Sequence, residues 1–94
     1  MTLQSFKESL SALNPPSDIS EYLKALWYDA HGDWDKAHKI IQDIDDKSAS
    51  LIHAYLHRKE GDLFNANYWY NKAARNTPAS STDIEWEQIV TEFL

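Results

Sequence analysis

The sequence predicts an all-α domain of about six helices, and two observations support this prediction. Between breaks, apolar residues recur at i, i+3, i+4 and i+7, which is the spacing of one helix face and not the alternation of a strand. The breaks are few, with two glycines and three prolines among 94 residues, and they separate segments of helical length. That length suits one domain with a modest core, so we expect residues 1–94 to fold as a single unit.

The first helix is expected over residues 2–13. One stripe of this segment is apolar and consists of Leu3, Phe6, Leu10 and Leu13. The pair Pro15-Pro16 then ends it, because a residue that precedes a proline is pushed out of the helical region.

The next unit, about residues 18–46, is expected to be a helical hairpin. Asp18 and Glu21 have the spacing of a capping box and predict the start of its first helix. Gly32 suits the left-handed position that follows a helix, and Asp33 can cap the second helix. The Gly-Asp pair therefore predicts a tight turn between two antiparallel helices.

A second hairpin is expected over about residues 47–78. Asp45 or Asp46 can cap its first helix, Gly61 can end that helix, and Asp62 can cap the second.

A last helix is expected over about residues 83–93, because Thr82 and Glu85 again have capping-box spacing. This helix and the one at residues 2–13 would cover the two open ends of a stack of hairpins.

The two hairpins repeat one another at a period of 29 residues. Three features of the first unit recur in the second: Gly32-Asp33 falls on Gly61-Asp62, Ala25 on Ala54, and Ala37 on Ala66. The alanines lie at facing positions, where a larger side chain would push the helices apart. A repeat of this length is typical of stacked helical hairpins.

These units resemble tetratricopeptide repeats, which carry small residues on both helices, Gly-Asp at the turn and a proline shortly after. The second unit shows this pattern as Ala54, Gly61, Asp62, Ala66, Tyr70, Ala73 and Pro78. The first unit shows part of it, as Ala25, Tyr28, Gly32, Asp33 and Ala37. The family's period is about 34 residues, so the link between the units is short here. The resemblance implies a right-handed stack of two hairpins.

The resemblance also implies a function, because the family binds peptides on the inner face of the first helix of each unit. The matching positions are Tyr22, Leu26, Asp29, Leu51, Tyr55, Arg58 and Lys59. We therefore expect a small adaptor or scaffold that binds a protein partner, either a peptide or a helix. The alternative is that the N-terminal helix lies across this face and fills it.

Three histidines offer a different function, a metal- or small-ligand-binding module. His53 and His57 have the i,i+4 spacing that lets two imidazoles share a metal ion, and His38 lies on the preceding helix. The competing interpretation is that these residues only pack and form hydrogen bonds between helices.

Aromatic residues are frequent, with four tryptophans and five tyrosines. Trp34, Trp69 and Tyr70 fall on apolar stripes and are expected in the core, whereas the pattern does not place Trp27 or Trp86. Core filling is the favoured interpretation. An exposed tryptophan would instead favour a homodimer, or a self-associating structural protein.

Composition excludes several other classes. The net charge of −6 argues against binding to a nucleic-acid backbone, and the absence of cysteine excludes thiolate sites and disulfides. No phosphate loop or nucleophile elbow is present, so we expect neither an enzyme nor a bound cofactor. No apolar run approaches the roughly 18 residues of a membrane span, and no leader pattern is visible, so a cytoplasmic location is expected.

Overall fold

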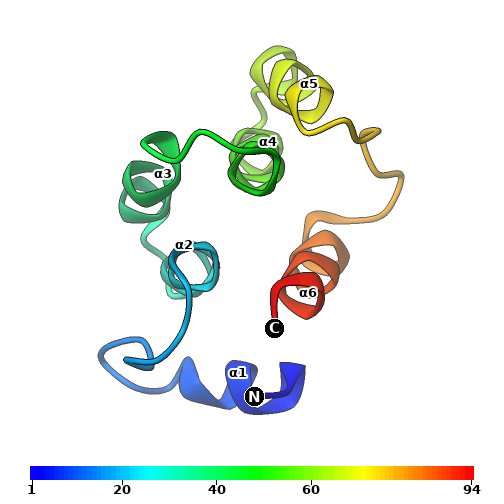
Figure 1. The fold of residues 1–94 in the computed structure, drawn as a ribbon. Helices are drawn as coiled ribbons and strands as arrows, with labels where there is room; N and C mark the ends of the chain where they lie inside the picture. The colour runs from blue at the N-terminus through cyan, green and yellow to red at the C-terminus, as the bar shows by residue number, and fades with distance from the viewer.

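Six α-helices follow one another along the chain in the structure, a computed structural model that describes all residues 1–94 (Figure 1). The helices are α1 (Leu3–Ser9), α2 (Glu21–Ala30), α3 (Trp34–Gln42), α4 (Lys47–Glu60), α5 (Leu63–Lys72) and α6 (Thr82–Phe93). There is no strand, and the all-α prediction is confirmed.

Aspartates fix the starts of three helices. The carboxylates of Asp33, Asp46 and Asp62 each accept a hydrogen bond from the backbone N–H three residues later, at 3.1, 2.7 and 3.2 Å. Gly32 and Gly61 follow the ends of α2 and α4 with φ of +90°, which L residues rarely adopt. The Gly-Asp turns of both hairpins, and the aspartate caps of α3, α4 and α5, are therefore those that the sequence predicts.

Two predicted helix starts are wrong. Ser20, and not Asp18, caps α2, because its hydroxyl accepts a hydrogen bond from the Leu23 N–H at 3.2 Å. Ser81, and not Thr82, caps α6 in the same way, with the Ile84 N–H at 3.2 Å. In both cases a serine hydroxyl lies at the extended residue just before the first helical turn, which is the position that N-capping requires.

The first helix is shorter than predicted. It ends at Ser9, after which the backbone tightens into i→i−3 hydrogen bonds through Ala12. The Ser9 hydroxyl donates to the Phe6 carbonyl at 2.6 Å, a local bond that competes with helix continuation. Leu13, expected on the apolar stripe, is 89% exposed as a result.

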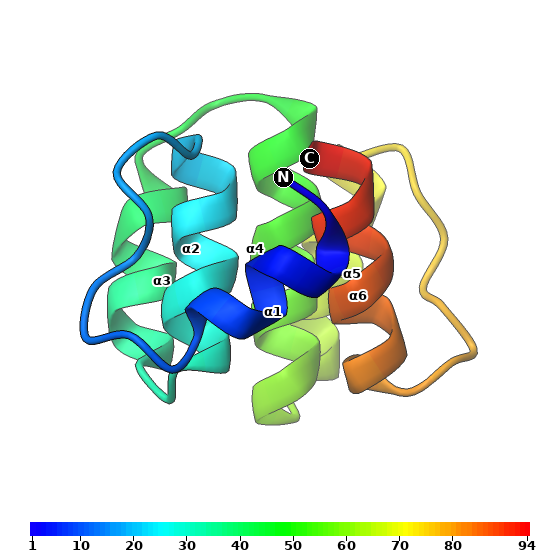
Figure 2. The same ribbon diagram turned by 90° about the horizontal axis from the view of Figure 1, so that it is seen from below.

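The helices are arranged as two hairpins closed by α6. Helices α2 and α3 form one hairpin, α4 and α5 form the other, and α3 packs against α4 (Figure 1). Helix α6 lies against both α2 and α4, so these three helices form the inner layer, with α3 and α5 outside. Helix α1 crosses over the face of α6 (Figure 2).

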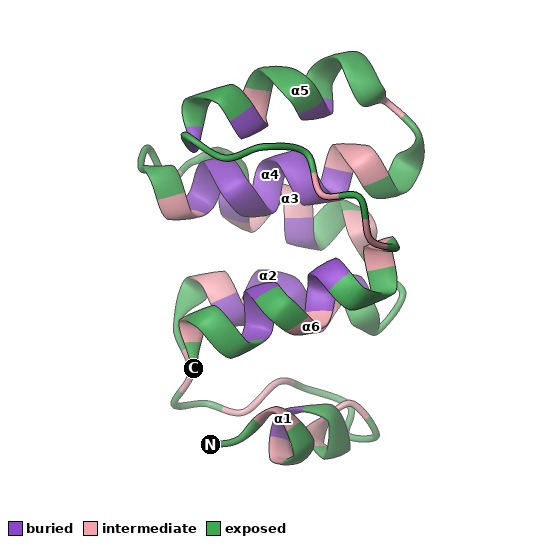
Figure 3. Cartoon of the chain, turned by 90° about the vertical axis from the view of Figure 1, so that its right-hand side faces the viewer, coloured by how far each residue is buried: buried purple, intermediate pink, exposed green.

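The core centres on α4, which is buried over residues 49–56 (Figure 3). Trp27 and Trp86, which the pattern did not place, are buried, whereas Trp34 and Trp69 are only half-buried. The Trp86 indole N–H donates to the Leu26 carbonyl at 3.0 Å and so fixes α6 to α2. None of the six helices combines the length and the apolar character required to cross a bilayer.

Candidate functional site

The face expected to bind a partner is largely covered by α6. Leu26, Asp29, Leu51 and Tyr55 are all buried. At its edge, the Tyr22 ring stacks on Phe93 of α6 with centroids 5.4 Å apart. The segment that fills this face is thus the last helix, and not the N-terminal helix considered as the alternative. Helix α1 instead packs outside α6, with the Phe6 and Trp86 rings 5.9 Å apart.

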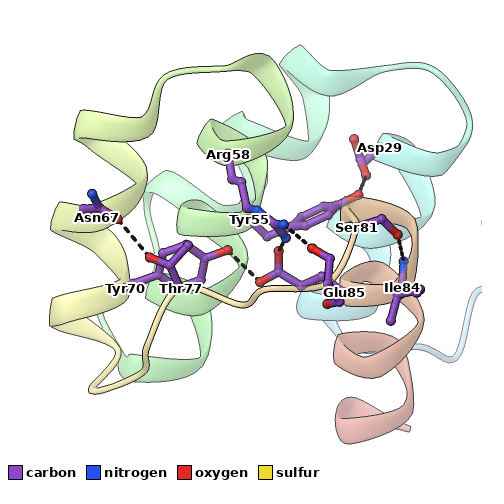
Figure 4. Close-up of polar contacts among 10 residues, drawn as sticks. Asp29, Tyr55, Arg58, Asn67, Tyr70, Thr77, Ser81, Ile84 and Glu85 are labelled. Carbon is purple, nitrogen blue, oxygen red and sulfur yellow. Dashed lines mark hydrogen bonds and ion pairs between the residues drawn. The ribbon is translucent and has the colours of Figure 1, made fainter.

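Two buried carboxylates hold the polar residues of this face in place (Figure 4). Asp29 accepts a hydrogen bond from the Tyr55 hydroxyl at 2.6 Å and forms an ion pair with the Lys59 ammonium at 2.9 Å. Burial raises the pKa of the Tyr55 hydroxyl well above its usual value, and the charge of Asp29 adds to this effect. Tyr55 therefore stays protonated and acts as a donor.

The second carboxylate belongs to Glu85, a residue that the sequence did not mark as functional. It accepts a hydrogen bond from the Tyr70 hydroxyl at 2.6 Å and forms an ion pair with the Arg58 guanidinium at 2.8 Å. Arg58 also donates to the Ser80 carbonyl. Arg58 is therefore engaged in docking α6, and removing it would disturb the fold. The sequence marked Glu85 only as the capping-box partner of Thr82, a role that it does not have, because its carboxylate binds Tyr70 and Arg58.

One end of the predicted face remains open as a pocket of about 330 Å³. Its lining residues come from α1 and the residue that follows it, from α2 and α4, and from the first half of α6: Lys7, Leu10, Asp29, Ala30, Tyr55, Lys59, Asp83, Trp86 and Glu87. Three of them, Asp29, Tyr55 and Lys59, belong to the face that the sequence predicted. Periodicity could not find the α6 residues of this pocket, because they reach it only through docking.

The three histidines named from the sequence do come together, between α3 and α4. The His38 and His53 Nε2 atoms are 3.0 Å apart, and the His53 and His57 rings stack with centroids 4.9 Å apart. One potential ligand nitrogen from each of the three lies within 4.8 Å of the others. The fourth histidine, His31, is elsewhere, bonded to the Ala12 carbonyl at 3.0 Å.

We call His38, His53 and His57 the histidine cluster. Two tryptophan rings pack against it. The Trp34 ring stacks on His38 at 5.0 Å, and the Trp69 ring stacks on His53 at 3.9 Å. Burial, together with the neighbouring imidazoles of His38 and His57, lowers the pKa of His53 to about 4. Burial likewise lowers the pKa of His38. Both rings are therefore neutral near pH 7.

A third feature is the outer face of α5, where Leu63, Phe64 and Tyr68 are exposed by 60, 87 and 52%. Phe64 and Tyr68 lie one helical turn apart on the same side.

Comparison with protein-family models, with curated proteins and with solved structures finds no match to this chain.

Proposed function

We propose that the chain is a non-enzymatic, tetratricopeptide-like interaction module of the cytoplasm, an adaptor that binds a peptide segment of a partner protein. The observation that supports this proposal is the pocket at the open end of the predicted face. Asp29, Tyr55 and Lys59 line this pocket although α6 covers the rest of that face, and Lys59 is the exposed residue of the three.

The lining residues suggest what the pocket would accept. Tyr55 and Trp86, which are 2 and 7% exposed, form a buried aromatic part of its wall, while Lys59 and the Lys7–Glu87 ion pair place charges at the rim. Lys59 is partly exposed and donates to one protein carboxylate, so the ammonium has further N–H groups for a ligand acceptor. The volume is near the lower end of the roughly 300–1,000 Å³ of ligand sites. One or two side chains of an extended peptide would fit, and a whole helix would not.

The test combines peptide selection with two pocket variants. Peptides selected from a display library against the wild-type chain are measured for affinity by fluorescence anisotropy. Ala30→Phe would fill the pocket from an exposed position, and Lys59→Ala would remove the rim ammonium. Each should weaken binding about tenfold or more, the effect of losing one anchor contact of about 1.4 kcal/mol.

Lys39→Ala is the matched control, because Lys39 is an exposed lysine on α3 that does not line this pocket. It should leave the affinity unchanged, and circular dichroism should show equal helicity for all variants. Selected peptides that bind Ala30→Phe as tightly as the wild type would place the interaction elsewhere, and the proposal would be wrong.

A second candidate function is self-association through α5, supported by the exposed side chains of Leu63, Phe64 and Tyr68. Asp62 lies at the start of this helix and Lys72 at its end. An antiparallel copy of α5 would therefore bring opposite charges together at both ends of a two-fold contact.

A further inference from the structure

We infer that His38, His53 and His57 form a binding site for a divalent transition-metal ion, with Zn²⁺ as the best-matched ion. The site is separate from the pocket proposed above and does not depend on it. The three ligands come from α3 and α4, which belong to different hairpins.

Distances between the imidazoles favour this assignment. Zn²⁺ lies about 2.0–2.1 Å from each nitrogen ligand, so the ligands of a tetrahedral ion are about 3.3 Å apart. The His38 and His53 Nε2 atoms share a hydrogen bond at 3.0 Å, so they already have nearly this separation. A bound ion would replace that hydrogen bond, with the proton of the donor ring moved to its Nδ1 atom. One ligand nitrogen from each of the three histidines lies within 4.8 Å of the other two. A small rotation of the side chains would bring these nitrogens to the spacing that Zn²⁺ requires. The rings therefore lie close to a coordinating arrangement.

Neighbouring side chains hold two of the rings in that arrangement. Trp34 stacks on His38 with an angle of 9° between the planes, and its indole N–H donates to the Leu56 carbonyl at 2.9 Å. Trp69 stacks on His53 with an angle of 15°. Ligands whose rings are already fixed lose little conformational entropy when an ion binds.

Glu60 supplies the outer contact that metal-bound histidines usually have. Its carboxylate lies 2.9 Å from the His57 Nδ1 atom, which leaves Nε2 of the same ring for a metal. A carboxylate in this position orients the imidazole and raises its basicity. Glu60 also partly balances the charge of a bound cation.

Acidic side chains near the cluster favour a bound cation by charge attraction. The acidic groups around the cluster are Glu60, Asp35 and Asp62.

The ligand set also selects the class of ion. Three imidazoles suit Zn²⁺, Co²⁺, Ni²⁺ or Cu²⁺, whereas Ca²⁺ and Mg²⁺ require oxygen ligands. Because the ligands join α3 to α4, the bound ion would act as a cross-link between the two hairpins. Its expected effect is to stabilise their packing.

The test uses the untagged full chain, purified without a metal column, and Zn²⁺ or Co²⁺ alone as the probe. Calorimetric titration with Zn²⁺ should show one saturable site, and Co²⁺ should produce visible d–d absorption. At a Zn²⁺ concentration about a hundredfold above Kd, the melting temperature should rise by about 10–20 °C. EDTA should reverse the rise.

His38→Gln and His57→Gln test the ligands without opening the core, because both residues are only half-buried. Each should weaken Zn²⁺ binding more than the roughly tenfold to hundredfold loss expected from Glu60→Gln, an outer-contact variant. His31→Gln is the matched control and should bind as the wild type does. Helicity measured without metal shows whether each variant is folded.

Two results would overturn the inference. One is the absence of saturable Zn²⁺ and Co²⁺ binding to the folded wild-type chain. The other is unchanged affinity in folded His38→Gln, which would assign the ion to the second group of neighbouring ligands, His57, Glu60 and Asp62.

Discussion

Truncating Glu85 should destabilise the domain far more than truncating any exposed carboxylate. Glu85 is 2% exposed and accepts hydrogen bonds from the Tyr70 hydroxyl and the Arg58 guanidinium. The Arg58 side chain is itself only 14% exposed. Glu85→Ala would leave a largely buried guanidinium without its counter-ion, and the Tyr70 hydroxyl without its acceptor.

The expected loss follows from that burial. Removing one partner of a buried ion pair costs about 3–5 kcal/mol. A domain of this length has a total unfolding free energy of roughly 5–14 kcal/mol, so the loss is a large fraction of it. The melting temperature should fall by about 12–40 °C, at 4–8 °C per kcal/mol for a domain of this size.

Urea unfolding followed by tryptophan fluorescence and circular dichroism measures the loss. The control is Glu92→Ala on the same helix, because the Glu92–Arg75 ion pair is 41 and 48% exposed. It should cost no more than about 1 kcal/mol. The double variant Glu85→Leu with Arg58→Met should recover much of the stability, since replacing both charges leaves none unpaired. Equal losses for Glu85→Ala and Glu92→Ala would refute the burial of this pair.

Two further predictions concern the histidine cluster and α5. The pKa of His53 is about 4 in the folded chain against 6.5 when unfolded, so the unfolded state takes up the proton first. In metal-free buffer, its contribution to stability is full above pH 6.5 and is lost as the pH falls toward 4, by up to about 3 kcal/mol. His53→Gln should flatten this part of the urea-derived stability profile, and an unchanged profile would contradict the assignment. Phe64→Glu should convert a dimer to a 10.9 kDa monomer in light scattering, whereas Leu13→Glu, at an equally exposed position, should not. A wild-type chain that stays monomeric at all concentrations would exclude association through α5.

Local chemistry made much of the fold predictable. The Gly-Asp pairs placed the turn inside each hairpin, because a left-handed glycine and an aspartate cap act within a few residues of one another. The convergence of His53, His57 and His38 could also be predicted, since it needs only i,i+4 spacing and two packed helices. Metal binding itself stays a prediction.

The position of α6 could not be predicted in the same way. Periodicity shows which side of a helix is apolar, but not which other helix covers it. Glu85 has the sequence context of an ordinary acidic residue in a first helical turn. Its burial depends on Arg58 and Tyr70, which lie 27 and 15 residues earlier in the chain. The sequence therefore indicated which faces of α2 and α4 are turned inward, but not which helix covers most of that surface.

The contact between Trp86 and the Leu26 carbonyl has a consequence for the order of folding. These residues are 60 positions apart, whereas each hairpin closes through a Gly-Asp turn. Closing a 60-residue loop costs about 4 kcal/mol of chain entropy, so α6 gains little until both hairpins have formed a surface for it. We therefore expect local contacts to assemble quickly and the docking of α6 to limit the folding rate. Before that step, the inner face of α2 and α4 is open to solvent.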